Sequence, residues 1–130
     1  MKIFITAKFK NGENREEIEE LCAIVRESGF EDFCFVRDVE NYGREPFDLH
    51  ELMDRAREEI SKCDSLLIDF NGPATGRMIE LGIAYAMNKK IILITKRGTS
   101  IKETVLGVTD HVIEYDQWKD IRQPLSRILS

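Results

Sequence analysis

Short apolar runs alternate with helix-like segments along the whole chain, and this alternation constrains the fold more than any other feature. The strand-like runs cover residues 2–8, 33–37, 64–70, 90–95 and 111–115. Helical patterns follow over residues 13–28, 48–62, 78–88, 100–106 and 116–129. Repeated strand–helix units fold into parallel sheets with right-handed crossovers. The pattern therefore predicts an α/β fold.

Five strands in 130 residues predict a flavodoxin-like three-layer sandwich with a five-stranded parallel sheet of order 2-1-3-4-5. The length fits a single domain over residues 1–130. In this topology ligands bind outside the carboxyl ends of the strands, at the switch between the first and third strands. Residues 6–9 and 69–72 are expected there, and the start of the helix at 78–88 faces the same crevice.

Composition narrows the class of partner. The formal net charge of -5 argues against a nucleic acid polymer or an anionic membrane as the partner. No apolar stretch approaches about 18 residues, and the N-terminus lacks a signal-peptide pattern. The three cysteines, Cys22, Cys34 and Cys63, are far apart, which favours buried, reduced thiols over disulfides or a zinc site. We therefore expect a cytoplasmic protein.

The isolated carboxylate Glu80 is the strongest candidate catalytic residue. It is the single charged residue of Met78–Met87, in a helix that is apolar on nearly all sides. A carboxylate there is costly unless it is paired, hydrogen-bonded or neutralised. A structural glutamate near a helix N-terminus and a functional one are both compatible with the pattern, and the position at the switch point favours function.

The segment from Asn71 to Arg77 is a candidate ligand-binding turn. Gly72 and Gly76 let the backbone approach a ligand and present N–H groups to a phosphate or hydroxyl. Thr75 is either a ligand contact or the N-cap of the next helix. Arg77 either binds a phosphate or covers the surface.

Four further candidates lie where the first and third strands end. Asp69 either faces the ligand or caps the following turn. Thr6, Lys8 and Phe9 come at the end of the first strand. The lysine could bind an anion or remain solvated, and the phenylalanine could stack on a base or pack in the core.

A phosphoacceptor receiver domain has the same fold, and the sequence excludes it. Such a domain needs an acidic metal-binding pair after the first strand and a lysine after the fifth. The first strand here ends in Thr6-Ala7-Lys8, and a lysine there would repel the metal. We expect neither a metal ion nor a cofactor.

Residues 64–95 resemble the nucleoside 2-deoxyribosyltransferase superfamily, which includes deoxynucleoside 5′-monophosphate N-glycosidases. The resemblance is carried by Asp64 at the start of the third strand, the run Ile79–Ala86, and Lys89-Lys90 before the fourth strand. It implies a small nucleoside or nucleotide as ligand and a homodimer or higher homo-oligomer. It also implies that Glu80 attacks C1′ of the sugar to form a glycosyl-enzyme intermediate. We expect Asp69 to act with it.

The chain departs from the family pattern at two positions. Ala56 stands where the family has its second carboxylate, and Ala74 aligns with a phosphate-binding serine. Three functions follow. The leading one is cleavage or transfer of an N-glycosidic bond of a nucleoside or nucleotide. A non-catalytic nucleotide-binding or regulatory module is the alternative, and NAD cleavage is the third.

Overall fold

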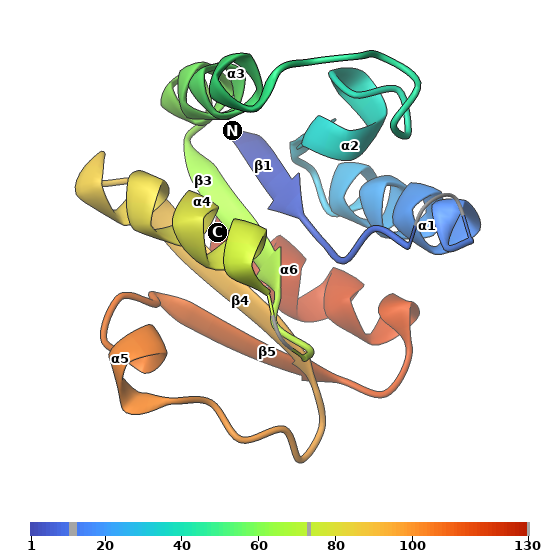
Figure 1. The fold of residues 1–130 in the computed structure, drawn as a ribbon. Coiled ribbons are helices and arrows are strands. Elements are labelled where there is room, and N and C mark those ends of the chain that lie inside the picture. Colours follow the sequence, from blue (N-terminus) through green and yellow to red (C-terminus); the bar gives the residue numbers. More distant parts are fainter. Residues whose placement is uncertain (11–12, 73, 130) are drawn as a thin grey trace.

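The computed structural model describes residues 1–10, 13–72 and 74–129, and Figure 1 shows its parallel sheet with helices on both faces. The strands are β1 (Lys2–Thr6), β2 (Glu31–Cys34), β3 (Ser65–Asp69), β4 (Lys90–Lys96) and β5 (His111–Tyr115). Their order is β2-β1-β3-β4-β5, and every neighbouring pair is parallel. This confirms the predicted flavodoxin-like α/β sandwich.

The helices divide between the two faces of the sheet. They are α1 (Arg15–Glu27), α2 (Phe35–Asp38), α3 (Leu49–Ser61), α4 (Thr75–Ala86), α5 (Glu103–Leu106), the 3-10 helix η1 (Trp118–Ile121) and α6 (Arg122–Leu129). Helices α1 and α6 cover one face, and α3 and α4 cover the other (Figure 1). Asp48 is the N-cap of α3, because its carboxylate accepts from the backbone N–H of His50 at 2.8 Å.

Each strand contributes side chains to both faces, because successive residues point to opposite sides of a sheet. Ile3, Ile5 and Leu67 pack with α1 and α6, whereas Phe4 and Leu66 pack with α3 and α4. A parallel sheet buried on both faces needs such continuous apolar runs. The same alternation decides on which side of the sheet the polar residues at the strand ends lie.

The second strand is shorter than predicted. The prediction of a strand over 33–37 is wrong beyond Cys34, because the chain turns there into the short helix α2. The Asp38 carboxylate accepts from the backbone N–H of Cys34 at 2.9 Å, and the N–H of Val39 donates to the carbonyl of Phe35 at 3.0 Å. A local side-chain bond of this kind competes with strand pairing.

Helix α4 begins earlier than the expected start at residue 78. Its N-cap is Ala74, so the assignment of Thr75 as the N-cap is wrong. The N–H of Met78 donates to the carbonyl of Ala74 at 2.9 Å, which places Thr75, Gly76 and Arg77 in the first helical turn. The low helix propensity of glycine hid this turn in the sequence. Pro73, within the predicted turn, lies outside the described residues.

Two smaller boundaries also differ from prediction. The helix expected over 100–106 is confined to Glu103–Leu106, and the final helix is divided into η1 and α6. The three cysteines are buried, as predicted. Within the described ranges, no helix has both the length and the apolar character needed to cross a membrane.

Candidate active site

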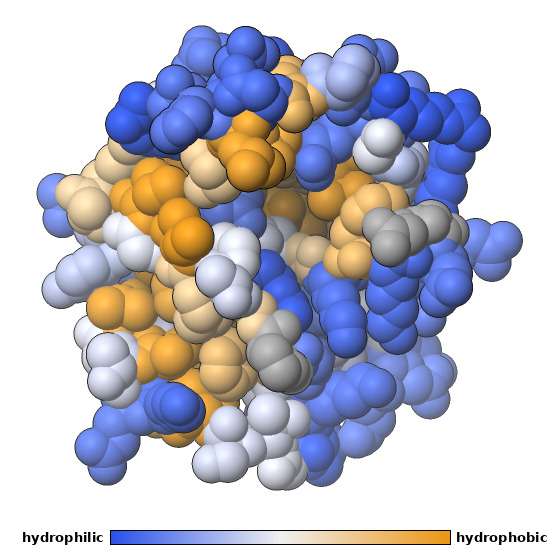
Figure 2. Space-filling view, in the orientation of Figure 1, coloured by the Kyte–Doolittle hydropathy of each residue, from blue (hydrophilic) through white to orange (hydrophobic). Residues whose placement is uncertain are grey.

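Glu80 lies in the wall of a cavity of about 270 Å³ at the carboxyl end of β1. In Figure 2 the surface is hollowed here, between α4 and α2 of Figure 1. The polar part of the lining comes from Thr6, Lys8, Glu40, Arg77 and Glu80. The cavity therefore lies at the predicted switch between β1 and β3 and holds charged groups of both signs.

A hydrogen bond connects Glu80 to the end of β1. The hydroxyl of Thr6, a residue that is 6% exposed, donates to Oε1 of Glu80 at 2.9 Å. Burial raises the pKa of Glu80 to about 7, and the neighbouring charge of Glu40 acts in the same direction. The Thr6 hydrogen bond and the Arg77 charge oppose this shift. Glu80 therefore exchanges its proton near neutral pH, which is typical of functional carboxyl groups.

Arg77 connects the start of α4 to the end of β3. Its guanidinium donates to the backbone carbonyl of Asp69 and, at 3.4 Å, to that of Asn71. Burial lowers the pKa of Arg77, while the charges of Asp69 and Glu80 act to raise it. An arginine keeps its charge despite such a shift, so Arg77 is a fixed cation beside the cavity of Glu80.

Asp69 lies in a second cavity, of about 530 Å³, on the side of the sheet covered by α1 and α6. The hydroxyl of Tyr115 donates to Oδ1 of Asp69 at 2.8 Å, and the side-chain amide of Asn71 donates to the same oxygen. Burial raises the pKa of Asp69, against the effect of these hydrogen bonds and of the Arg77 charge. The Asn71 amide oxygen accepts from the backbone N–H of Lys96 at 3.1 Å, which fixes the group.

The two cavities adjoin at the segment after β1, because Ala7, Lys8 and Ile18 line both. The predicted site residues that line the cavity of Glu80 are Thr6, Lys8, Phe9, Gly76 and Arg77. Those that line the second cavity are Lys8, Asp69 and Asn71. Gly72 and Thr75 are exposed and line neither cavity. The structure thus brings most of the predicted site together but places Asp69 and Glu80 in adjoining cavities.

Glu40 and Tyr115, which lie near the predicted carboxyl groups Glu80 and Asp69, were absent from the prediction. Glu40 lines the cavity of Glu80 and is half-buried, and burial raises its pKa. Tyr115 is buried beside Asp69. Glu40 belongs to a polar loop without periodicity, and Tyr115 ends a strand whose pattern gives no hint of a polar partner. Only the folded structure shows that these two side chains lie at the cavities, because it brings distant segments of the chain together.

The position of the missing family carboxylate is part of the hydrophobic core. Ala56 is 2% exposed and packs among apolar side chains. The neighbouring acids are in exposed ion pairs, Asp54 with Arg57 at 3.2 Å and Glu58 with Lys62 at 3.3 Å. Asp54 and Glu58 therefore do not replace that carboxylate.

No metal centre was found in the part of the chain that the structure describes. Among those residues, no three or more His, Cys, Asp or Glu side chains are grouped so that they could hold a metal ion.

The fold and the site together define a class of protein. It is an open parallel α/β domain with a carboxylate-bearing cavity at its switch point. The model of the nucleoside 2-deoxyribosyltransferase family matches residues 5–117, and the chain belongs to this family. A comparison with curated proteins found no match.

Solved structures with the same fold include two that carry enzyme names. The CMP N-glycosidase BcmB of Clostridium botulinum is 22% identical, with a TM-score of 0.73 over 98% of this chain and 99% of that one. A 2-deoxyribosyltransferase of Bacillus psychrosaccharolyticus is 21% identical, with a TM-score of 0.73 over 95% and 91%. A conserved protein of Enterococcus faecalis V583 is 13% identical, with a TM-score of 0.81 over 98% of each chain. At these identities the likeness establishes the shared fold.

Proposed function

We propose that the protein cleaves or transfers the N-glycosidic bond of a nucleoside, deoxynucleoside or nucleotide, with Glu80 as the nucleophile. The observation that carries the proposal is the position of Glu80, in a cavity at the switch point and hydrogen-bonded to Thr6. Membership of the nucleoside 2-deoxyribosyltransferase family supports the same reaction class.

The geometry of Glu80 suits attack on an anomeric carbon. Thr6 occupies one carboxylate oxygen, Oε1, which fixes the orientation of the group and leaves Oε2 for the sugar. A carboxylate in this position stabilises the positive charge that develops on the sugar ring and then forms a covalent glycosyl ester. The cation of Arg77 favours the ionised form that this attack requires.

The surrounding residues suit the parts of a nucleotide. We place the sugar beside Glu80, with Lys8 and Arg77 as the cations that meet a 5′-phosphate and Phe9 as a face for the base. Gly76 leaves room for the ligand at the first turn of α4, while Gly72 and Thr75 would contribute at its rim. In the adjoining cavity, Asp69 and Asn71 would contact ligand groups that extend past Lys8.

A non-catalytic nucleotide-binding module is the second candidate, and the burial of Ala56 favours it. The family's second carboxylate is replaced there by a core residue, so the usual acid is missing from its usual place. A protein that kept the cavity and lost the chemistry would bind a nucleotide without releasing a base.

Incubation with a panel of nucleosides, deoxynucleosides, their 5′-monophosphates and NAD separates the two candidates. We expect chromatography to detect free base with the wild type and none with Glu80→Ala. Equal release by both proteins would refute Glu80 as the nucleophile. Thermal stabilisation by a panel member without release of base would support the binding module.

We also propose that the protein is a cytoplasmic homodimer or higher homo-oligomer. Helix α4 exposes Ile79 and Tyr85, at 47% and 55%, and Leu49 at the start of α3 is 79% exposed. Figure 2 shows hydrophobic residues in the area occupied by α4 in Figure 1. An exposed apolar area of this kind is typical of an interaction surface. Free cysteines fit a reducing compartment.

A further inference from the structure

Glu40 is a second carboxyl group in the cavity of Glu80, supplied by the segment after α2. Within the described part of the chain, the Glu40 side chain has no hydrogen-bond or ion-pair partner. Its residue is half-buried, and among the described residues no buried side-chain oxygen lacks a partner, so the unpaired Glu40 carboxyl group keeps contact with water. A carboxyl group in the cavity wall that reaches water can exchange its proton with water, as an acid–base residue must.

The backbone around Glu40 is tightly held. The N–H of Glu40 donates to the carbonyl of Phe35 at 3.1 Å, and its own carbonyl accepts from Gly43 at 3.0 Å and Glu45 at 3.1 Å. The next two residues, Asn41 and Tyr42, have φ angles of 47° and 56°, in the left-handed region that side chains other than glycine rarely adopt. Strained residues of this kind concentrate at functional sites.

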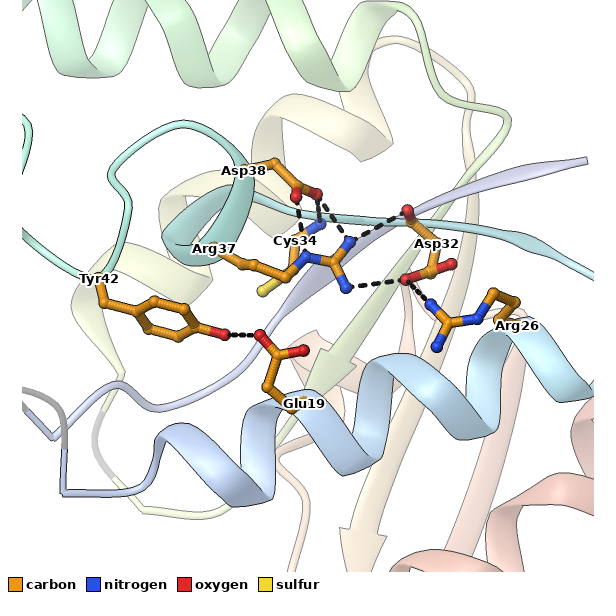
Figure 3. A network of polar contacts seen from close by, with 7 residues as sticks. All are labelled: Glu19, Arg26, Asp32, Cys34, Arg37, Asp38 and Tyr42. Atoms are coloured by element: carbon orange, nitrogen blue, oxygen red, sulfur yellow. Dashed lines mark hydrogen bonds and ion pairs between the residues drawn. The ribbon is translucent and has the colours of Figure 1, made fainter.

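Side-chain contacts attach the same segment to its surroundings, as Figure 3 shows. The Arg37 guanidinium pairs with Asp32 at 2.9 Å and with Asp38 at 2.8 Å. The Tyr42 hydroxyl donates to Glu19 on α1. Glu40 lies between these anchors in the sequence, so its backbone is fixed on both sides. A pre-organised position is what an acid–base group requires.

The surroundings of the two carboxyl groups differ. Glu80 has the hydrogen bond from Thr6 and the nearby charge of Arg77, both of which favour its ionised form. Glu40 has no such donor, and burial raises its pKa. Two carboxylates in one cavity repel each other, so the pair releases its two protons in separate steps and holds a single proton between these steps. Of the two singly protonated forms, the one with Glu80 ionised leaves the carboxylate held by Thr6 ready to attack and the proton on Glu40.

We infer that Glu40 is the acid–base residue of the glycosidic reaction in which Glu80 is the nucleophile, an inference that rests on the proposed function. In the first step Glu80 bonds to C1′, the C1′–N bond breaks, and the departing base takes the Glu40 proton. In the second step the Glu40 carboxylate takes a proton from water as the water oxygen bonds to C1′. The ester bond to Glu80 then breaks, and Glu80 is a carboxylate again.

The test compares two leaving groups in Glu40→Gln. A nucleobase needs a proton as it leaves, whereas 4-nitrophenolate does not. We expect base release from the deoxynucleoside and 5′-monophosphate panel to fall at least about a hundredfold in Glu40→Gln. Release of 4-nitrophenolate from 4-nitrophenyl glycosides of ribose and 2-deoxyribose should fall less than about fivefold in its first turnover. Glu45→Gln is the matched control, because Glu45 is exposed on the same loop and lines neither cavity.

The outcomes separate this inference from the proposed function. Base release by the wild type but not by Glu80→Ala would support Glu80 as the nucleophile. If, in addition, Glu40→Gln slows the release of both leaving groups equally, or slows neither, the role of Glu40 is refuted and that of Glu80 stands. If wild type releases neither product, both are refuted. Carbon-13 NMR of the glutamate carboxyls provides a second readout. Glu40→Gln should lower the pKa of Glu80 because a neighbouring negative charge is removed, and an unchanged pKa would overturn the pairing.

Discussion

Thr6 and Glu80 connect the end of β1 to the second turn of α4 through a hydrogen bond of 2.9 Å. This bond joins an inner strand of the sheet to the carboxylate on which the proposed chemistry depends. Because the Thr6 hydroxyl donates to the carboxylate, it stabilises the ionised form of Glu80 against burial.

Thr6→Val should move the acidic limb of the pH–rate profile upward. The substitution keeps the shape of the side chain and removes the donor, so the pKa of Glu80 should rise above its value of about 7. A bond to a charged group contributes about 1.5 kcal/mol, which corresponds to a roughly tenfold lower rate at pH 6. Thr6→Ser, which retains the donor, should keep the wild-type profile. An unshifted profile in Thr6→Val would contradict the assignment.

Glu80→Gln should stabilise the fold at pH 8. Burial raises the pKa of Glu80 from 4.5 to about 7, so the folded protein binds this proton more tightly than the unfolded chain does. The unfolding free energy should therefore decrease as the pH rises from about 4.5 to about 7, by up to about 3 kcal/mol. Urea unfolding at pH 5 and pH 8 measures the effect. The Glu80→Gln variant should lose this part of the pH dependence. A variant that is less stable than the wild type at pH 8 would contradict a raised pKa of Glu80 in the folded protein.

Tyr115→Phe should weaken the fold through Asp69. The change removes a buried donor to the Asp69 carboxyl group, which leaves the amide of Asn71 as its side-chain donor among the described residues. A lost buried hydrogen bond of this kind costs about 1–3 kcal/mol. Urea unfolding should show the loss at pH 7. The matched control is Tyr85→Phe, because Tyr85 is 55% exposed and should tolerate the change. Equal stability of the two variants would contradict the role of Tyr115.

Ile79→Lys should disrupt the proposed oligomer. Ile79 is 47% exposed on α4, and a lysine there would place a charge in an apolar interface. Light scattering should find an oligomer for the wild type and a monomer for the variant, with an unchanged circular dichroism spectrum. Leu106→Lys is the control, since Leu106 is 43% exposed on a different helix, α5. A monomeric wild type would refute the proposal.

The sheet could be predicted from the sequence because parallel strands that are buried on both faces have continuous apolar sequences. The runs at Leu66–Ile68 and Ile91–Ile94 are fully buried, and short continuous apolar runs between polar segments favour strands of such a sheet. Phe35 was misassigned for a related reason, since it is buried in a helical turn and its apolar character is the same there as in a strand. The hydrogen bond from the backbone N–H of Cys34 to the Asp38 carboxylate favours the helical turn over the strand, and hydrophobic periodicity does not reveal this bond.

The candidate site was predictable where it depends on topology and not where it depends on side-chain direction. Topology alone brings Thr6 and Glu80 to one edge of the sheet. The sequence did not show that Asp69 would point toward Tyr115, into the adjoining cavity. Nor did it indicate Glu40, because a loop has no period from which the direction of a side chain follows. Ala56 of α3 replaces the family's second carboxylate, while the structure places the carboxyl group of Glu40, from the segment after α2, in the cavity of Glu80.

Trapping of the glycosyl-enzyme tests the central claim most directly. A nucleoside with fluorine at C2′ of the sugar slows both steps, because fluorine destabilises the positively charged transition state, and this lets the ester accumulate. Mass spectrometry of peptides after brief incubation should find the added fluorosugar on the peptide that carries Glu80. Glu80→Ala should acquire no such mass. A fluorosugar on a different residue, or release of base by the wild type without any covalent adduct, would contradict Glu80 as the nucleophile.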